Sequence, residues 1–196
     1  MSDLMLDVGQ ANELKLAFRR ADWSNDDIKR LCEGSVLVDV RSVLRGHAAI
    51  NVIEHVIDCD ADPFNPWASE GFTIEDHQKG GQWKFDPKEI EFFLTSSQKS
   101  GKVEGNKLRK ELAKKPVFNA NVLDYMLAHP ELIPDEWKTD GNGNTRYIFF
   151  WGTVYRNRDG FLYVRYLYWD VGRWRWSRSW LGHDWYSNDP AAVRAS

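Results

Sequence analysis

The stretch RYIFFWGTVYRNRDGFLYVRYLYWDVGRWRWSRSWL, residues 146–181, decides the fold. It contains three runs that are rich in aromatic and β-branched residues. They are joined by NRDG (157–160) and by the turn from Asp170 to Gly172. Both joints are short and contain glycine, which is typical of β-hairpins. The stretch therefore predicts a three-stranded antiparallel meander as the simplest product.

The sequence before this meander predicts a mostly helical part with a few strands. Apolar residues at helical spacing and probable capping residues indicate three short helices, then three more further along the chain. Alternating residues indicate a strand between the two groups, followed by one or two short strands around Gly80 and Gly81. The expected helices cover residues 11–21, 24–34, 35–46, 86–97, 105–115 and 119–129, and the expected strands lie in 51–58 and 71–85.

These elements together predict the α+β class and a two-part chain. The glycine-rich segment TDGNGNT (139–145) is the best candidate boundary in the sequence. It would divide a mostly helical part, residues 1–138, from the aromatic meander, residues 146–196. The pattern leaves open whether the meander is a separate domain or packs on the first part as a single domain.

The composition is that of a globular protein. Hydrophobic residues make up 42% and charged residues 28% of the 196 residues, which argues against wholesale disorder. The longest strongly apolar stretch (147–155) is about half as long as a membrane-spanning helix. Cys32 and Cys59 are too few for a disulfide framework, although a single bridge between them stays open. The first ten residues lack the pattern of a secretory signal, so we expect a soluble, cytoplasmic protein.

Five phrases of the sequence resemble a family of uncharacterised bacterial proteins. They are VIDCDADPF, KGGQWKFDP, VFNANVLDYMLAHPELIP, FFWGTVYR and VRYLYWD, which are spread over nearly the whole chain. The resemblance implies a bacterial, cytoplasmic origin. It implies no activity.

The first candidate binding surface is GRWRWSRSW, residues 172–180. Side chains alternate between the two faces of a strand. Trp174, Trp176, Arg178 and Trp180 would therefore share one face, and Arg173, Arg175, Ser177 and Ser179 the other. We expect the tryptophans to pack in the core. The alternatives are a surface on which sugars or bases stack and a protein interface, because three exposed tryptophans need a partner.

The second candidate is a basic helix. Lys107, Lys110 and Lys114 lie on one face of the helix predicted at 105–115, in a segment (98–115) with a net charge of +5. Such a stripe can lie along a phosphate backbone, but a solvated face is the more common arrangement. The next helix offers few residues that read base edges, so specific recognition of DNA is not expected.

The only acidic cluster is Asp58, Asp60 and Asp62. It resembles the start of a calcium-binding EF-hand loop, but Pro63 and Ser69 stand where that loop needs glycine and glutamate. We therefore prefer an ordinary loop to a metal site, and no zinc spacing or phosphate-binding glycine loop is present. No cofactor is expected.

The sequence therefore favours a non-enzymatic binding module whose contact surface lies on the meander. Its partner would be a protein or a single-stranded nucleic acid, with no membrane involved, and its oligomeric state is unknown. The alternative is a metal-assisted hydrolase or nuclease that uses Asp58, Asp60 and Asp62, with His55 nearby.

Overall fold

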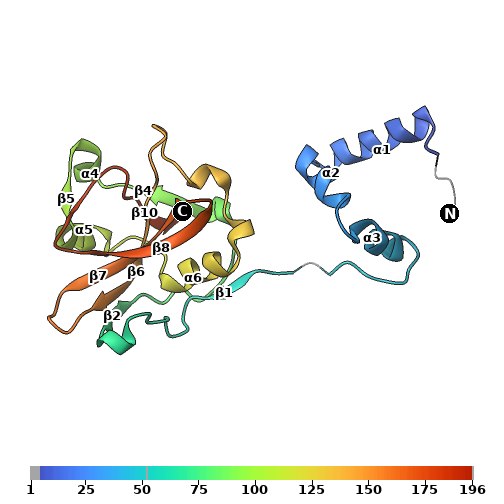
Figure 1. Cartoon of the computed structure of the whole chain (residues 1–196). Helices are drawn as coiled ribbons and strands as arrows, with labels where there is room; N and C mark the ends of the chain where they lie inside the picture. Colours follow the sequence, from blue (N-terminus) through green and yellow to red (C-terminus); the bar gives the residue numbers. More distant parts are fainter. Residues whose placement is uncertain (1–4, 52, 196) are drawn as a thin grey trace. The chain divides into compact units, whose positions relative to one another are not determined.

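A computed structural model describes residues 5–51 and 53–195. The chain divides into two compact units, Met1–Ile53 and Glu54–Ser196 (Figure 1). The expected boundary at 139–145 thus lies inside the second unit. There Asp140 organises a closed loop, because its Oδ1 accepts hydrogen bonds from the backbone N–H groups of Asn142 and Asn144, at 2.8 and 2.9 Å.

The first unit contains the three predicted helices, α1 (Val8–Arg20), α2 (Asn25–Leu31) and α3 (Val36–Leu44). Ser24 caps α2 as predicted, and it forms a reciprocal pair of hydrogen bonds with Asp27. None of the residues in these three helices is buried. No helix in the described part of the chain is long and apolar enough to cross a membrane.

The second unit is built around a six-stranded sheet that contains the predicted meander. The strand order is β4-β10-β6-β7-β8, and β2 also pairs with β6. The meander strands pair antiparallel, whereas β10 pairs parallel with β6 and antiparallel with β4. The chain is therefore of the α+β class, as predicted. The strands are β2 (Thr73–His77), β4 (Ile90–Phe93), β6 (Ile148–Arg156), β7 (Leu162–Asp170), β8 (Arg173–Trp180) and β10 (Ala191–Arg194).

The helix predicted at 86–97 is wrong. Asp86 caps and Pro87 begins a helix there, as expected, but it is a single 3-10 turn, η2 (Pro87–Glu89). The chain then forms β4, which pairs with β10, and only afterwards the short helix α4 (Ser96–Ser100). The aromatic and β-branched side chains of β4 suit a strand, and a remote partner satisfies its backbone.

The strands predicted at 51–58 and 71–85 are present, but their lengths or pairing differ from the prediction. The strand predicted at 51–58 is reduced to β1 (Val56–Asp58). The two short strands around Gly80 and Gly81 exist, but they do not pair with each other. The first is β2, on the main sheet, and the second is β3 (Gln82–Lys84), which pairs with β1. A separate pair joins β5 (Val103–Glu104) and β9 (Asp184–Trp185).

The helices predicted at 105–115 and 119–129 are confirmed as α5 (Gly105–Leu112) and α6 (Ala120–Ala128). They belong to different clusters of the core. Leu123 and Met126 of α6 pack with Phe150, Leu167 and Trp174 in the first cluster. Leu108 and Leu112 of α5 pack with Trp151, Val164 and Trp185 in the second. Because Val164 and Leu167 of β7 point to opposite faces, the two helices cover opposite faces of the sheet. Short 3-10 helices complete the unit at η1 (Ala68–Glu70), η3 (Pro130–Leu132) and η4 (Asp135–Trp137).

The start of α6 lies very close to β6. A Cβ atom placed on Gly152 would be 2.9 Å from the Cα, Cβ and N atoms of Asn119, the residue that caps α6. Thr153 Oγ1 also accepts a 2.9 Å hydrogen bond from the Ala120 N–H. This contact fixes the helix on the sheet and requires glycine at position 152.

Candidate functional site

The arginine- and tryptophan-rich segment forms β8, a strand at one edge of the main sheet. Its eight residues pair with β7 in an unbroken antiparallel register, from Asp170 opposite Arg173 to Tyr163 opposite Trp180. Residues opposite each other in such a pair point to the same face. Trp174, Trp176, Arg178 and Trp180 therefore share one face of β8, as the sequence predicts.

The indole rings on this face contact other parts of the protein. Trp174 is 9% exposed, belongs to the same core cluster as Leu123, and lies 5.4 Å from Trp169 between ring centroids. Trp176 lies 5.5 Å from Trp67, and the Arg165 guanidinium lies 4.3 Å from its ring. Trp174 is thus buried, and Trp176 is half-buried with other side chains against its ring.

Trp180 is the most peripheral of the three. It is half-buried, and its ring lies 5.3 Å from both Phe161 and His183. Gly182 closes over it, since a Cβ atom there would lie 2.3 Å from the indole. Protein side chains thus contact all three tryptophans.

Arg178 lies among the rings on the same face. Its guanidinium is 4.4 Å from the Trp67 ring and 4.5 Å from the Phe72 ring, and it pairs with Glu70 at 3.6 Å. Its Nη1 is buried without a hydrogen-bond partner. The aromatic rings and the Glu70 carboxylate stabilise the charge of Arg178, so this arginine is tolerated on an otherwise aromatic face.

The opposite face of β8 carries the two remaining arginines of the strand. Arg173 is exposed, and Arg175 is half-buried with its Nε 3.2 Å from Asp170 Oδ2. Ser177 and Ser179 alternate with them and are half-buried. This face therefore presents positive charge close to the end of the β7–β8 hairpin.

The outer edge of β8 is free of strand partners. Within residues 5–51 and 53–195, β8 pairs with β7 alone and ends the strand order. A strand at the edge of a sheet leaves half of its backbone N–H and C=O groups without strand partners. The sequence does not reveal this edge, because it depends on which strands lie between β4 and β8.

The lysines of the basic segment lie elsewhere, with Lys107 and Lys110 in α5 and Lys114 just after its end. Lys107, Lys110 and Lys114 are exposed, as predicted for a solvated face, while Leu108 and Leu112 are buried. The helix covers the sheet face opposite the tryptophans of β8, which is the face to which Arg173 and Arg175 point. Arg178 and the tryptophans point to the other face, so the structure does not bring all of the predicted binding residues onto one surface.

The acidic loop is held by hydrogen bonds within the protein. Asp60 Oδ1 accepts the backbone N–H groups of Gly80 and Gly81, both at 2.9 Å, and Asp58 Oδ1 accepts the Asp60 N–H at 2.9 Å. Asp62 is exposed in the same loop. Among the described residues, no three His, Cys, Asp or Glu side chains are placed to hold a metal ion. His55 shares a 2.7 Å hydrogen bond with the Tyr125 hydroxyl.

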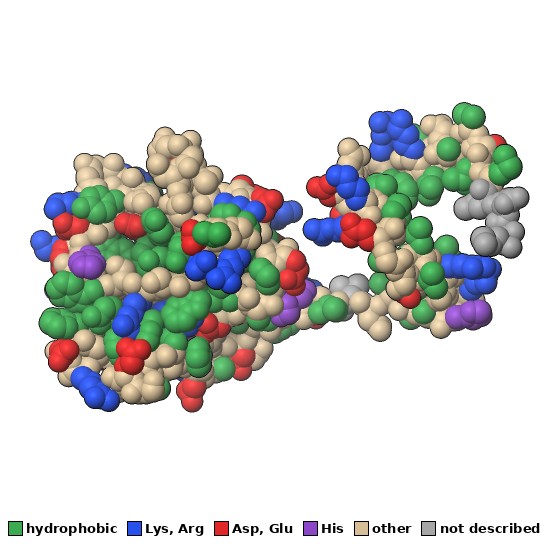
Figure 2. Space-filling model, viewed as in Figure 1, with side chains coloured by type: hydrophobic (Ala, Val, Ile, Leu, Met, Phe, Trp, Pro, Cys, Tyr) green, Lys and Arg blue, Asp and Glu red, His purple; other side chains and the backbone are tan. Residues whose placement is uncertain are grey.

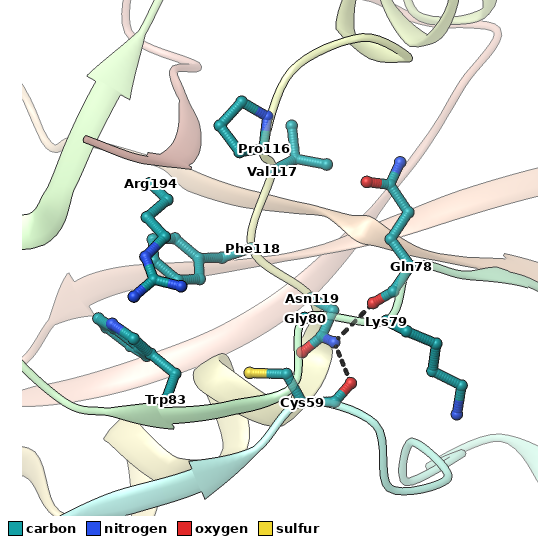
Figure 3. Close-up of a pocket in the computed structure, with 10 residues that line it drawn as sticks. All are labelled: Cys59, Gln78, Lys79, Gly80, Trp83, Pro116, Val117, Phe118, Asn119 and Arg194. Atoms are coloured by element: carbon teal, nitrogen blue, oxygen red, sulfur yellow. Dashed lines mark hydrogen bonds between the residues drawn. The ribbon is translucent and has the colours of Figure 1, made fainter. Parts of the chain in front are cut away.

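A small pocket of about 160 Å³ lies beside this loop (Figure 3). Its wall includes Cys59, Trp83, Phe118 and Arg194. The Cys59 sulfur points towards the side on which Trp83 and Arg194 lie. Asn119 Nδ2 donates hydrogen bonds to the Cys59 and Gln78 carbonyl groups, at 2.8 and 3.0 Å, and so joins three segments of the wall.

The thiol of this pocket is not activated. Burial, reinforced by the negative charges of Asp60 and Asp58, raises the pKa of Cys59 to about 11. A thiol with so high a pKa is protonated at neutral pH, and the thiolate is the nucleophile. This pocket could not be predicted from the sequence, because its residues come from segments far apart in the chain.

Comparisons with protein families, with curated proteins and with solved structures find no match for this chain. The free edge of β8, with arginines on both of its faces, is the feature that most directly offers a contact to another molecule.

Proposed function

We propose that the protein is a non-enzymatic cytoplasmic binding module that accepts an extended, acidic segment of a partner protein at the edge of β8. The observation that carries the proposal is the unpaired outer edge of this eight-residue strand. An extended peptide can add to such an edge through main-chain hydrogen bonds, while its alternating side chains provide specificity.

The side chains of β8 suggest which segment fits. Residues that lie opposite each other in neighbouring strands interact most strongly. Arg173 and Arg175 point to one face, so acidic residues at alternate positions of an added strand would pair with them. Trp176 and Arg178 point to the other face, where apolar or aromatic residues fit best. An acidic and apolar alternation is the expected recognition pattern.

The same charges disfavour pairing between two β8 edges. Two copies of β8 would bring the arginines of both strands together, and like charges on adjacent strands are destabilising. The arginines therefore favour an acidic partner over a second copy at this edge.

A single-stranded nucleic acid fits the surface less well. Recognition of single strands depends on bases that stack on exposed aromatic rings. Here Trp174 is buried, and Trp176 packs against Trp67 on one side and near Arg165 on another. The contacts of these rings within the protein favour a protein partner over a nucleic acid.

The test uses a fluorescein-labelled peptide of eight residues in which glutamate and valine alternate. We expect saturable binding by fluorescence anisotropy, weakened by salt. Hydrogen exchange should slow at the amides of β8. A peptide with lysine in place of glutamate, and an oligothymidylate, should not bind. Preferential binding of the oligothymidylate, or unchanged exchange in β8, would overturn the proposal.

Two charge-matched variants locate the contact. The pair Arg173→Glu and Arg175→Gln should weaken peptide binding about tenfold, since each exposed charge pair contributes about 0.2–1 kcal/mol. The pair Lys107→Glu and Lys110→Gln removes the same charge from α5 and should leave the affinity unchanged. Equal losses in the two variants would show that only the overall charge matters.

A further inference from the structure

The helices of the first unit expose most of their apolar residues. Among the described residues between Met5 and Ile53, thirteen large apolar side chains are exposed, and in Figure 2 apolar groups appear on the surface of this unit. Amphipathic helices normally bury their apolar stripe. In a folded protein, an apolar surface of this extent marks a place where another molecule binds.

The third helix is rich in exposed apolar residues. In α3, VLVDVRSVL, six of nine residues are valine or leucine, and most of them form one wide apolar stripe. Leu37 is 52% and Leu44 is 82% exposed, and they share one face because they are seven positions apart. Val38, which is 64% exposed, lies about 100° further around the helix. An amphipathic helix normally buries such a stripe, so we expect a partner to cover this side of α3.

We propose that a second copy of this chain covers these helices, so that the protein dimerises through α1, α2 and α3. The helices lie between Val8 and Leu44, a span below the roughly 40 residues under which a fold usually needs disulfides, a metal or oligomerisation. Cys32 is the only cysteine before Ile53. No cluster of metal-binding side chains occurs in the described part of this unit. Of these three sources of stability, oligomerisation is the one left for this unit.

The charge of the unit fits a second copy rather than a strongly charged partner. Residues 1–53 contain eight acidic and seven basic side chains, so their formal charge is −1. Two nearly neutral surfaces approach each other without the strong repulsion that keeps highly charged proteins apart. The acidic partner proposed for β8 would gain no electrostatic attraction from this unit, because the unit has no net positive charge.

The exposed area is also of the right size. Burying one valine or leucine side chain removes roughly 60–120 Å² of apolar surface from water. The thirteen side chains are on average more than half exposed, so one copy offers roughly 700 Å². A stable interface of standard size buries about 800 Å² on each partner.

Sedimentation of the full chain tests this inference. We expect a mass of twice 22.8 kDa that falls to 22.8 kDa on dilution. The variant with Leu37→Asp and Leu44→Asp should raise the dimer dissociation constant at least about 30-fold. The control Val171→Asp changes a residue that is 83% exposed in the second unit, and it should dimerise normally. A wild-type chain that is monomeric at every concentration overturns the inference.

Energy transfer locates the contact independently of mass. Cys32 is exposed and Cys59 is buried, so dyes attach selectively to the first unit. Mixing donor-labelled with acceptor-labelled chains should give transfer that the two leucine substitutions abolish. The pair Arg173→Glu and Arg175→Gln should dimerise like the wild type, which separates this inference from the function proposed for β8. Loss of the dimer in that variant would place the interface on the sheet edge and overturn the inference.

Discussion

Replacing Asp124 by alanine should destabilise the second unit strongly, because it leaves a buried guanidinium without its partner. Arg165 is 1% exposed, and its Nη2 and Nη1 donate hydrogen bonds to Asp124 Oδ1 and Oδ2, at 2.6 and 3.0 Å. Removing one member of a buried ion pair costs about 3–5 kcal/mol. The Asp124 side chain is 30% exposed, so water can reach the site and the loss should be close to 3 kcal/mol.

Urea denaturation followed by tryptophan fluorescence measures this loss. Nine of the ten tryptophans lie in Glu54–Ser196, so the signal reports on the second unit. We expect the free energy of unfolding to fall by about 3 kcal/mol. The melting temperature should fall by roughly 10 °C.

A double variant distinguishes the unpaired charge from lost packing. Replacing the pair by Arg165→Met and Asp124→Leu removes both charges while keeping apolar volume, and such exchanges are often neutral or stabilising. We therefore expect the double variant to be within about 1 kcal/mol of the wild type. A cost of less than about 1 kcal/mol for Asp124→Ala, or a double variant as unstable as the single one, would contradict this expectation.

Three further predictions concern other sites. Val171 has a φ of 45° in the β7–β8 turn, where asparagine is better tolerated, so Val171→Asn should stabilise the protein by about 1 kcal/mol in the same denaturation assay. At pH 8 a thiol reagent should modify Cys32 rapidly and Cys59 only on unfolding, because Cys59 is buried and its pKa is raised to about 11; two equally fast thiols would contradict this. Burial raises the pKa of Asp189, so the carboxyl favours the folded state below its unfolded pKa, near 3.8, and this contribution is lost as the pH rises through the folded value. As the pH rises, the free energy of unfolding of the wild type should therefore fall relative to that of Asp189→Asn. Two curves of stability against pH that stay parallel would contradict a raised pKa for Asp189.

The elements that depend on neighbouring residues alone could be predicted from the sequence. The reciprocal hydrogen bonds of Ser24 and Asp27, and the cap of α6 at Asn119, involve residues at most three positions apart. The turn from Asp170 to Gly172 is local in the same sense. These features could be predicted because their hydrogen bonds are made within one turn of the chain.

The strand β4 could not be predicted in this way. Its local signals, Asp86 and Pro87, do begin a helix, but they fix only one turn of it. The following residues form a strand because β10, about a hundred positions later, lies beside them. A segment with both helical and strand character takes the form that a remote partner stabilises, and the partner is not visible locally.

The strand β8 depends both on its local sequence and on segments far away in the chain. The alternation of a strand is a local property, so the sequence is enough to predict that Trp174, Trp176 and Arg178 share a face. Whether that face is covered depends on Trp67, on α6 and on the order of strands in the sheet, which join β8 only in the folded chain. Trp174 is buried and Trp176 is half-buried while the backbone edge stays free, and this could be seen only in the folded chain, because burial is a relation between segments that are distant in sequence.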